Sequence, residues 1–176
     1  MRYLIVILFF WGLTSAKAQN DFYESSGDVL QLALPAIALG STFVYRSDDR
    51  PTWQFIKTYT LSVGVTYILK YTVNEQRPNG GEHSFPSGHT ASAFAGASFL
   101  QLRYGWKIGI PAYLLATYTG YTRIKADKHY WWDVFGGASI SIGSSLLFVK
   151  PFKKNKLAWS FYKNGRYYVA GCRYQF

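Results

Sequence analysis

Five apolar segments, separated by short polar loops, constrain the fold of this chain most strongly. They cover roughly residues 29–45, 53–70, 90–103, 106–121 and 132–149. Each segment is near the lower limit of the roughly 20 residues that an α-helix needs to cross a bilayer. Small residues in the third and fifth segments suit close helix packing, and tryptophans stand at several segment edges, as in the aromatic belts of membrane proteins. The sequence therefore predicts an all-α helical membrane bundle of five spans.

The bulk composition leaves a second fold open. The chain is 49% hydrophobic, yet its mean hydropathy of -0.04 is low for a bundle that spans a bilayer. The alternative is a soluble all-α bundle, although the fourth and fifth segments show little of the polar face that soluble helices carry. A net charge of +10 would indicate a polyanionic partner for a soluble protein. For a membrane protein we expect no nucleic acid as partner.

The first 18 residues have the pattern of an export signal. Arg2 is followed by an apolar run over 3–13 and by the small-x-small sequence Ala16-Lys17-Ala18. We expect residues 1–18 to be a cleaved signal peptide, because the apolar run is short for a span. The alternative is an uncleaved anchor, which would make six spans. Both interpretations place residue 19 outside the cytoplasm.

The rest of the chain divides into a helical-bundle domain over 19–149 and a basic, aromatic tail over 150–176. We expect residues 19–28 to be irregular. In the tail, Asn164-Gly165 between two apolar and aromatic runs predicts a β-hairpin. Its role is not predicted, but we expect it to lean on the bundle or the membrane surface, because an isolated hairpin is marginal. Cys172 is the only cysteine and is expected to be a free thiol.

Basic residues in the loops predict the orientation. Arg46, Arg50, Arg103, Lys107 and the lysines after position 149 fall on one side of the membrane, which the positive-inside tendency assigns to the cytoplasm. The loops 70–89 and 121–131 then lie on the outer side. These outer loops also carry basic residues, which is an exception to the positive-inside tendency. We expect a function of these basic residues to explain the exception.

Two clusters lie in the first outer loop. Lys70 and Arg77 offer an ammonium and a guanidinium, which bind phosphate oxygens, although both could be ordinary juxtamembrane cations. In the second cluster Ser87 can cap the following helix, and Gly88 lets the backbone approach a ligand. His89 is well placed there to protonate a departing oxygen, the alternative being a plain helix cap with a solvated histidine. Neither cluster is specific by itself.

The third cluster is Arg123, His129 and Asp133. His129 and Asp133 are four positions apart, so on a helical turn they share a face. A carboxylate bonded to one ring nitrogen fixes the tautomer and leaves the other nitrogen free to attack, while Arg123 would neutralise phosphate charge. The alternative is a surface ion pair. Nearby His83 is expected to be a surface residue.

The three clusters together resemble one known family. The pattern Lys70-x6-Arg77-Pro78, Pro86-Ser87-Gly88-His89 and Arg123-x5-His129-x3-Asp133 is similar to that of the type 2 phosphatidic acid phosphatase and vanadium haloperoxidase superfamily, over roughly 53–149. The resemblance implies an all-α fold with the site at the outer helix ends. It implies a phosphohistidine at His129, orientation of His129 by Asp133, general acid catalysis by His89, and phosphate binding by Lys70, Arg77, Ser87, Gly88 and Arg123. Thr122 departs from the family's usual serine but keeps the hydroxyl.

The expected function is that of a metal-independent membrane phosphatase with no cofactor. It would hydrolyse lipid phosphates or pyrophosphates at the periplasmic face of a bacterial inner membrane. Phosphatidate-like lipids, isoprenyl pyrophosphates and lipid A phosphates are possible substrates, among which the sequence does not choose, and it does not predict the oligomeric state. One alternative is a vanadate-dependent haloperoxidase, although those members are larger and soluble. The other is a membrane protein that binds anionic lipids without catalysis.

Overall fold

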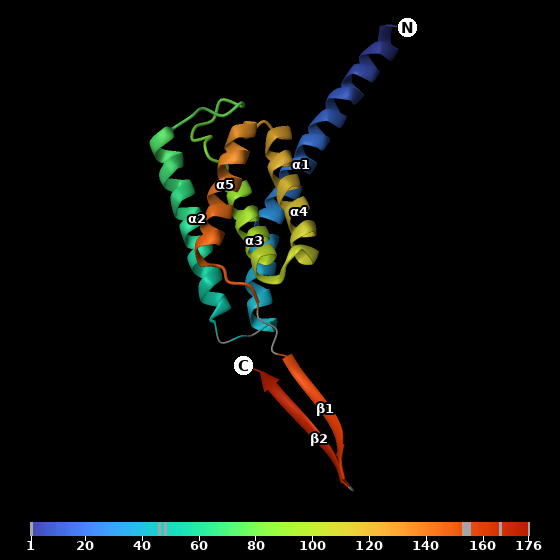
Figure 1. The fold of residues 1–176 in the computed structure, drawn as a ribbon. Helices are drawn as coiled ribbons and strands as arrows, with labels where there is room; N and C mark the ends of the chain where they lie inside the picture. Colours follow the sequence, from blue (N-terminus) through green and yellow to red (C-terminus); the bar gives the residue numbers. More distant parts are fainter. Residues whose placement is uncertain (1, 46, 48, 153–155, 166, 176) are drawn as a thin grey trace.

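The computed structural model describes residues 2–45, 47, 49–152, 156–165 and 167–175, and places five helices in them (Figure 1). The helices are α1 (Arg2–Val44), α2 (Pro51–Val73), α3 (Gly88–Tyr104), α4 (Trp106–Lys125) and α5 (Trp131–Phe148). Each of the five apolar segments lies within one helix. The predicted all-α bundle of five helices is therefore confirmed.

The N-terminal helix is longer than expected. Residues 19–28, which we expected to be irregular, are helical, and α1 runs without a break over its 43 residues. The polar side chains of this region bond to the α4 end of the bundle. Ser26 Oγ lies 3.3 Å from the hydroxyl of Tyr118, and Lys128 Nζ lies 3.0 Å from Glu24 Oε1. The apolar run of the predicted signal peptide forms the start of the same helix, and its cleavage stays a prediction.

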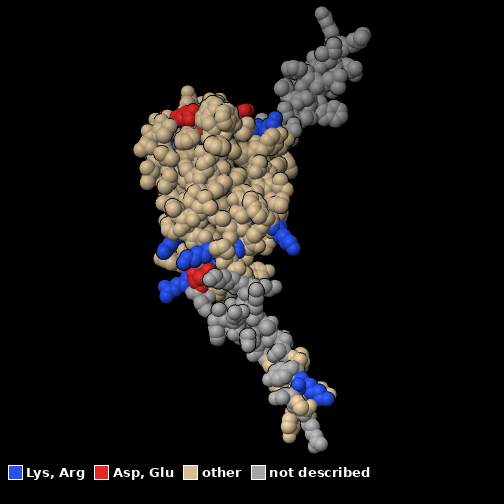
Figure 2. Space-filling view, viewed as in Figure 1, with Lys and Arg blue, Asp and Glu red and all other residues tan. Residues whose placement is uncertain are grey.

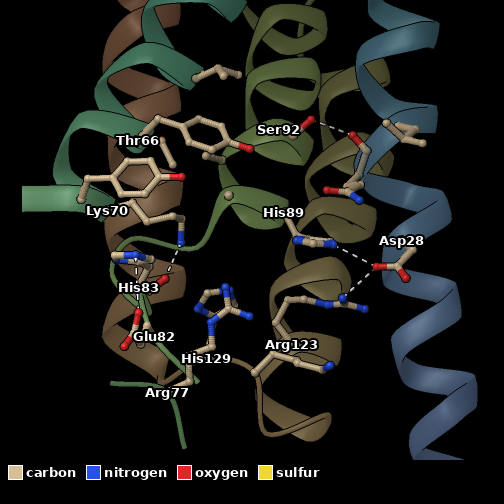
Figure 3. Close-up of a pocket in the computed structure, with 18 of the residues that line it drawn as sticks. Asp28, Thr66, Lys70, Arg77, Glu82, His83, His89, Ser92, Arg123 and His129 are labelled. Carbon is tan, nitrogen blue, oxygen red and sulfur yellow. Dashed lines mark hydrogen bonds and ion pairs between the residues drawn. The ribbon is translucent and has the colours of Figure 1, made fainter. Parts of the chain in front are cut away.

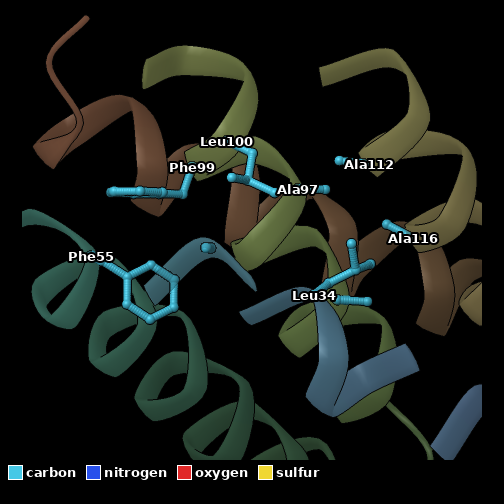
Figure 4. Packing of buried hydrophobic residues seen from close by; sticks show 9 residues of the cluster. Leu34, Phe55, Ala97, Phe99, Leu100, Ala112 and Ala116 are labelled. Atoms are coloured by element: carbon cyan, nitrogen blue, oxygen red, sulfur yellow. The ribbon is translucent and has the colours of Figure 1, made fainter. Parts of the chain in front are cut away.

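Helix α3 is central and packs against all four other helices. Its small residues allow close approach: a Cβ at Gly96 would lie 2.6 Å from the backbone carbon of Leu34 in α1. The buried apolar cluster extends from this contact across the bundle (Figure 4). It consists of Leu34, Ala38, Phe55, Ala93, Ala97, Phe99, Leu100, Ala112 and Ala116.

Hydroxyl groups between the helices explain the low mean hydropathy. Ser62 of α2 and Ser141 of α5 are both buried, with their Oγ atoms 2.6 Å apart, and Ser98 and Ser145 form a similar pair at 2.5 Å. Such pairs join helices in a membrane while their polar atoms stay hidden from the surface. Large apolar side chains are exposed instead, and the face in Figure 2 has an uncharged band between two charged ends.

Hydropathy alone identifies fewer spans than we expected. In the described part of the chain, Asp21–Val44 is the one helical stretch that is long and apolar enough to count as a candidate span. The serines and threonines of the other helices lower their average, although many of them, such as Thr58, Ser62 and Ser141, are buried between helices. The all-α fold is shown, whereas the number of five spans stays a prediction.

A buried ion pair closes the end of the bundle opposite to loops 70–89 and 121–131. The side chain of Arg103 is fully buried, and it donates two hydrogen bonds of 3.0 Å to the two carboxylate oxygens of Asp49. Arg103 also donates to Ser47 Oγ and to the backbone oxygen of Lys150. The hydrogen bond from Arg103 holds the pKa of Asp49 well below its ordinary value. This network ties the α1–α2 loop to the ends of α3 and α5.

Replacing Asp49 by Asn is expected to lower the free energy of unfolding by about 3 kcal/mol, because it leaves the buried guanidinium of Arg103 without its counter-charge. Thermal unfolding in detergent micelles measures the loss. The matched control is Asp127→Asn, an exposed loop carboxylate, for which we expect an unchanged transition. An unfolding temperature of Asp49→Asn equal to that of the control would contradict the assigned role.

The predicted hairpin is present as β1 (Lys156–Asn164) and β2 (Tyr167–Gln175), paired antiparallel with Asn164 opposite Tyr167. Within the described residues neither strand contacts a helix, and Figure 1 shows the hairpin projecting from the bundle end. The expected support by the bundle is therefore wrong, whereas support by the membrane surface stays a prediction. The strands satisfy each other's backbone, and Phe161 and Tyr168 stay exposed. The side chain of Cys172 lies outside the described residues.

Candidate active site

A cavity of about 710 Å³ opens at the end of the bundle that carries loops 70–89 and 121–131 (Figure 3). Its walls come from α1, α2, α3, α4 and the loops that join them. The predicted site residues that line it are Lys70, Arg77, Gly88, His89, Arg123 and His129. The other two, Ser87 and Asp133, are buried directly behind its wall. The structure thus brings the three separate clusters of the sequence together.

Asp133 is the centre of a buried hydrogen-bond network. Its Oδ2 accepts hydrogen bonds from Ser84 Oγ at 2.5 Å, from the Tyr130 backbone N–H at 2.8 Å and from His129 Nδ1 at 3.4 Å. Its backbone oxygen accepts a bond of 2.9 Å from the N–H of Ser87. Asp133 therefore joins the start of α5 to the start of α3 and holds His129 from behind.

His129 itself lies in the α4–α5 loop, so the expectation that it shares a helical turn with Asp133 is wrong. The loop closes because the backbone N–H groups of Lys128 and His129 bond to the carbonyl of Arg123, at 3.0 and 3.3 Å. The imidazole is 4% exposed and Asp133 holds its Nδ1. Nε2 is then the nitrogen left to react.

Burial lowers the pKa of His129. The hydrogen bond to Asp133 acts in the opposite direction, while the charges of Lys70 and Arg77 lower the pKa further. A lowered pKa means that the ring stays neutral, with a free electron pair, to a more acidic pH than an exposed histidine does. A nucleophile needs this neutral form.

Titration followed by NMR is expected to give a pKa for His129 below the ordinary value of about 6.5. The chain has 3 histidines, so histidine-selective labelling gives few signals, and His129→Gln identifies the one that belongs to His129. A midpoint at or above the ordinary value would show that the Asp133 hydrogen bond outweighs burial and would contradict this account.

Ser87 and Gly88 form the start of α3. Ser87 is the N-cap, as predicted, and its Oγ accepts hydrogen bonds from the backbone N–H of Thr90 at 3.4 Å and from the Thr90 hydroxyl at 3.0 Å. A Cβ at Gly88 would meet no atom within 4 Å, and Gly88 lines the cavity. The missing side chain therefore leaves room for an anion at the helix N-terminus, where free N–H groups and the helix dipole favour negative charge.

Gly88→Ala is expected to keep the fold and to lower kcat/KM for a phosphate ester by about 10²-fold. A methyl group in the anion site would displace the bound phosphorus by on the order of 1 Å, and a displacement of that size costs about this factor in rate. Gly143→Ala is the control, because its added Cβ also meets no atom within 4 Å and Gly143, on α5, does not line the cavity. Steady-state kinetics compare the two variants. Equal kcat/KM in both would remove Gly88 from the anion site.

Lys70 and Arg77 supply positive charge from the opposite wall. Lys70, in the last turn of α2, donates from Nζ to the backbone oxygens of His83 at 2.8 Å and Ser84 at 3.3 Å. Arg77 has a buried Nε without a protein partner among the described residues. A buried donor in this state suits an anionic ligand.

His83 is not the surface residue that we expected. It lines the cavity, and its ring meets the ring of Tyr71 edge-on with centroids 4.8 Å apart. Its φ of 58° turns the loop so that its carbonyl faces Lys70. His83 therefore shapes the cationic wall of the cavity through its backbone.

Two residues of the site were not predicted from the sequence. Asp28 of α1 bonds to both His89 and Arg123, with distances of 2.9 Å to each. Ser84 donates the shortest of the hydrogen bonds to Asp133. The four-residue spacing of Glu24 and Asp28 is the sequence signal for a shared helical face. This signal applies only to a helix, and we expected residues 19–28 to be irregular.

The arrangement has the parts that phosphoryl transfer needs. A neutral imidazole held from behind can attack phosphorus, and a second imidazole across the cavity can move a proton. Lysine and arginine side chains can neutralise the charge of a phosphate. The same cavity is lined by all of these groups, and also by the exposed side chains of Leu32, Tyr67 and Tyr71.

Comparisons with known proteins agree with this geometry. The family model described as the PAP2 superfamily matches residues 51–157. Among curated proteins, the chain is 29% identical to a lipid A 4'-phosphatase of Helicobacter pylori, over 98% of this chain and 96% of that protein. It is 36% identical to the undecaprenyl-diphosphatase BcrC of Bacillus subtilis, over 47% of this chain and 42% of BcrC.

Two crystal structures have the same fold. LpxE of Aquifex aeolicus superposes with a TM-score of 0.64 at 27% identity, covering 74% of this chain and 84% of LpxE. A transmembrane PAP2-type phosphatidylglycerolphosphate phosphatase of Bacillus subtilis superposes with a TM-score of 0.58 at 22% identity, covering 74% of each chain, and supports the fold alone. The match of the family model to more than half of the chain, together with these similarities, identifies it: the chain belongs to the PAP2 superfamily of membrane lipid phosphatases.

Proposed function

We propose that this protein is a metal-independent phosphatase that hydrolyses phosphate or pyrophosphate esters of lipids through a phosphohistidine at His129. The observation that carries the proposal is the buried pairing of Asp133 with Nδ1 of His129, on the wall of a cavity that Lys70, Arg77 and Arg123 also line. A tautomer fixed in this way directs Nε2 toward a bound phosphate.

In the first step Nε2 of His129 attacks phosphorus, and the bond between phosphorus and the leaving oxygen breaks. His89 gives its proton to that oxygen, so the lipid leaves as a neutral alcohol. In the second step His89 accepts a proton from water, the hydroxide attacks phosphorus, and the phosphorus–nitrogen bond breaks. Inorganic phosphate leaves, and both histidines return to their starting states.

The cations and the start of α3 would hold the phosphate during both steps. Lys70 and Arg77 approach from one wall and Arg123 from the other, so charge that develops on the phosphoryl oxygens has a partner on each side. Ser87 fixes the first turn of α3, and Gly88 leaves its N–H groups accessible. In this proposal the side chains perform the electrostatic work that a metal ion performs in other phosphatases.

The placement in the membrane is part of the proposal. Five helices with an uncharged outer band would span the inner membrane of a bacterial cell, with the Asp49–Arg103 end in the cytoplasm and the cavity on the periplasmic side. Basic residues before α2 and after α5 support this orientation. A lipid could then present its phosphate to the cavity from the outer leaflet, with its chains left in the bilayer.

The similarity to a lipid A 4'-phosphatase extends over nearly the whole chain and makes lipid A phosphates one substrate class to test. The experiment measures phosphate release from a panel of dioctanoyl phosphatidate, farnesyl pyrophosphate and lipid A, by purified protein in detergent with EDTA present. We expect release from at least one of them. No release from any, or abolition by EDTA, would overturn the proposed function or its metal-free mechanism respectively.

The side of the membrane can be tested with the same reaction. Spheroplasts that contain the protein are expected to hydrolyse an externally added, charged short-chain phosphate ester, which does not cross the membrane. Hydrolysis that requires lysis of the spheroplasts would place the cavity in the cytoplasm and contradict the orientation.

A further inference from the structure

We propose that Asp28 is a positioning residue for the general acid His89, an inference that rests on the proposed function. One carboxylate oxygen of Asp28 lies 2.9 Å from Nε2 of His89 and 2.9 Å from Nη1 of Arg123 (Figure 3). The three residues come from α1, α3 and α4, so the contact forms only when these helices are packed together.

The N-terminal helix is shaped for this contact. Gly27 precedes Asp28, and a Cβ at Gly27 would lie 2.2 Å from Thr122 Oγ1 and 2.3 Å from Nη2 of Arg123. Nη2 of Arg123 also donates to the backbone oxygens of Tyr23 and Glu24. The absent side chain therefore lets the α1 backbone lie directly on the guanidinium, and this approach brings Asp28 to His89.

Charge explains what Asp28 does there. The groups that face His89 are Asp28 on α1, Arg123 on α4 and His129 in the α4–α5 loop. Among these described neighbours Asp28 is the one that is negative. Burial lowers the pKa of His89 to about 4, and the charges of Arg123 and His129 act in the same direction. The hydrogen bond and the charge of Asp28 raise the pKa of His89 instead. A general acid must carry a proton before it can give it away, so Asp28 is the neighbour that favours the protonated form.

Substrate binding gives no reason for a carboxylate at this position. A phosphate held by Arg123 would meet the negative charge of Asp28 at close range, which costs binding energy. We therefore expect the contribution of Asp28 to appear in kcat and not in KM. Loss of its charge should leave KM unchanged or lower.

The test uses two substrates that differ in their need for an acid. The alkoxide released from dioctanoyl phosphatidate must be protonated as it leaves, whereas the phenolate released from p-nitrophenyl phosphate is stable without a proton. Asp28→Asn is expected to lower kcat for the phosphatidate by about 10²-fold, because general acid catalysis contributes at least that much. For p-nitrophenyl phosphate the loss in the pre-steady-state burst of p-nitrophenolate, which reports the first step alone, should be only a few-fold. The basic limb of the kcat profile should move to lower pH.

His89→Ala should show the same dependence on the leaving group, and Asp28→Asn in the His89→Ala background should cause no further loss. The control is Asp21→Asn, an exposed carboxylate seven positions earlier on α1, with expected wild-type kinetics. Equal losses on both substrates, or a loss that persists in the His89→Ala background, would reduce Asp28 to a structural role and overturn the inference. If the wild type hydrolyses another lipid of the panel instead of the phosphatidate, that lipid replaces the phosphatidate in the test. A wild-type protein inactive on the whole panel would overturn the proposed function and this inference with it.

Discussion

Replacing His129 by Ala is expected to lower phosphate release by on the order of 10⁵-fold, because among the described cavity residues His129 is the imidazole whose Nδ1 is held by a buried carboxylate, which leaves Nε2 free to attack. The positively charged side chains of Lys70 and Arg77 can neutralise the charge of a bound phosphate, but they have no free electron pair with which to attack phosphorus. His89 is engaged by Asp28 on its Nε2. The residual rate would reflect binding and electrostatic stabilisation alone.

The measurement is phosphate release from dioctanoyl phosphatidate by wild type and variant at equal protein concentration. His83→Gln is the matched control, since His83 lies on the wall of the same cavity but contributes through its backbone carbonyl. We expect this control to lose less than about tenfold, as for a neutral hydrogen-bond contact. A His129→Ala variant within tenfold of wild type would rule out nucleophilic catalysis by this residue.

Asp133→Asn is expected to lower kcat by on the order of 10³ to 10⁴-fold, the range seen when the carboxylate of a catalytic histidine is replaced by an amide. Oδ2 of Asp133 accepts three hydrogen bonds, from Ser84, Tyr130 and His129. An amide can keep its oxygen at this position, because Oδ1 of Asp133 has no hydrogen-bond partner among the described residues. The amide nevertheless removes the negative charge that stabilises the positive charge developing on His129 during attack.

The matched control for Asp133→Asn is Ser84→Ala, which removes one of the three donors and keeps the carboxylate. Its expected loss is about tenfold, corresponding to one hydrogen bond. Because Asp133 is fully buried, thermal unfolding of both variants must accompany the kinetics. An Asp133→Asn variant that unfolds like wild type and retains wild-type kcat would contradict the orienting role.

The helices were predictable from the sequence because their apolar runs are bounded by clear signals. Ser87 caps α3, and Gly105 separates α3 from α4. The first helix was harder, since its polar stretch over 19–28 has no apolar face. Its helical form depends on partners distant in the sequence, such as Tyr118 and Lys128, which no local pattern reveals.

In the candidate site, too, residues that belong to a local pattern were predictable and residues placed by distant contacts were not. Lys70, His89 and His129 were recognisable because their spacing within each cluster is a local property of the chain. Asp28 was not recognisable, because it lies more than 60 positions before His89 in the sequence and joins the site only through the packing of α1. The hairpin illustrates the reverse case: its Asn-Gly turn is local and was predicted, whereas its position relative to the bundle was not.

The central claim is that His129 carries the phosphoryl group during turnover. The most direct measurement is rapid quenching of the protein with a ³²P-labelled lipid phosphate, followed by peptide mapping of the label. We predict an acid-labile, base-stable label on the peptide that contains His129, present in wild type and absent in His129→Ala. Turnover of the labelled substrate with no label on this peptide, or with an equal label in His129→Ala, would contradict the claim.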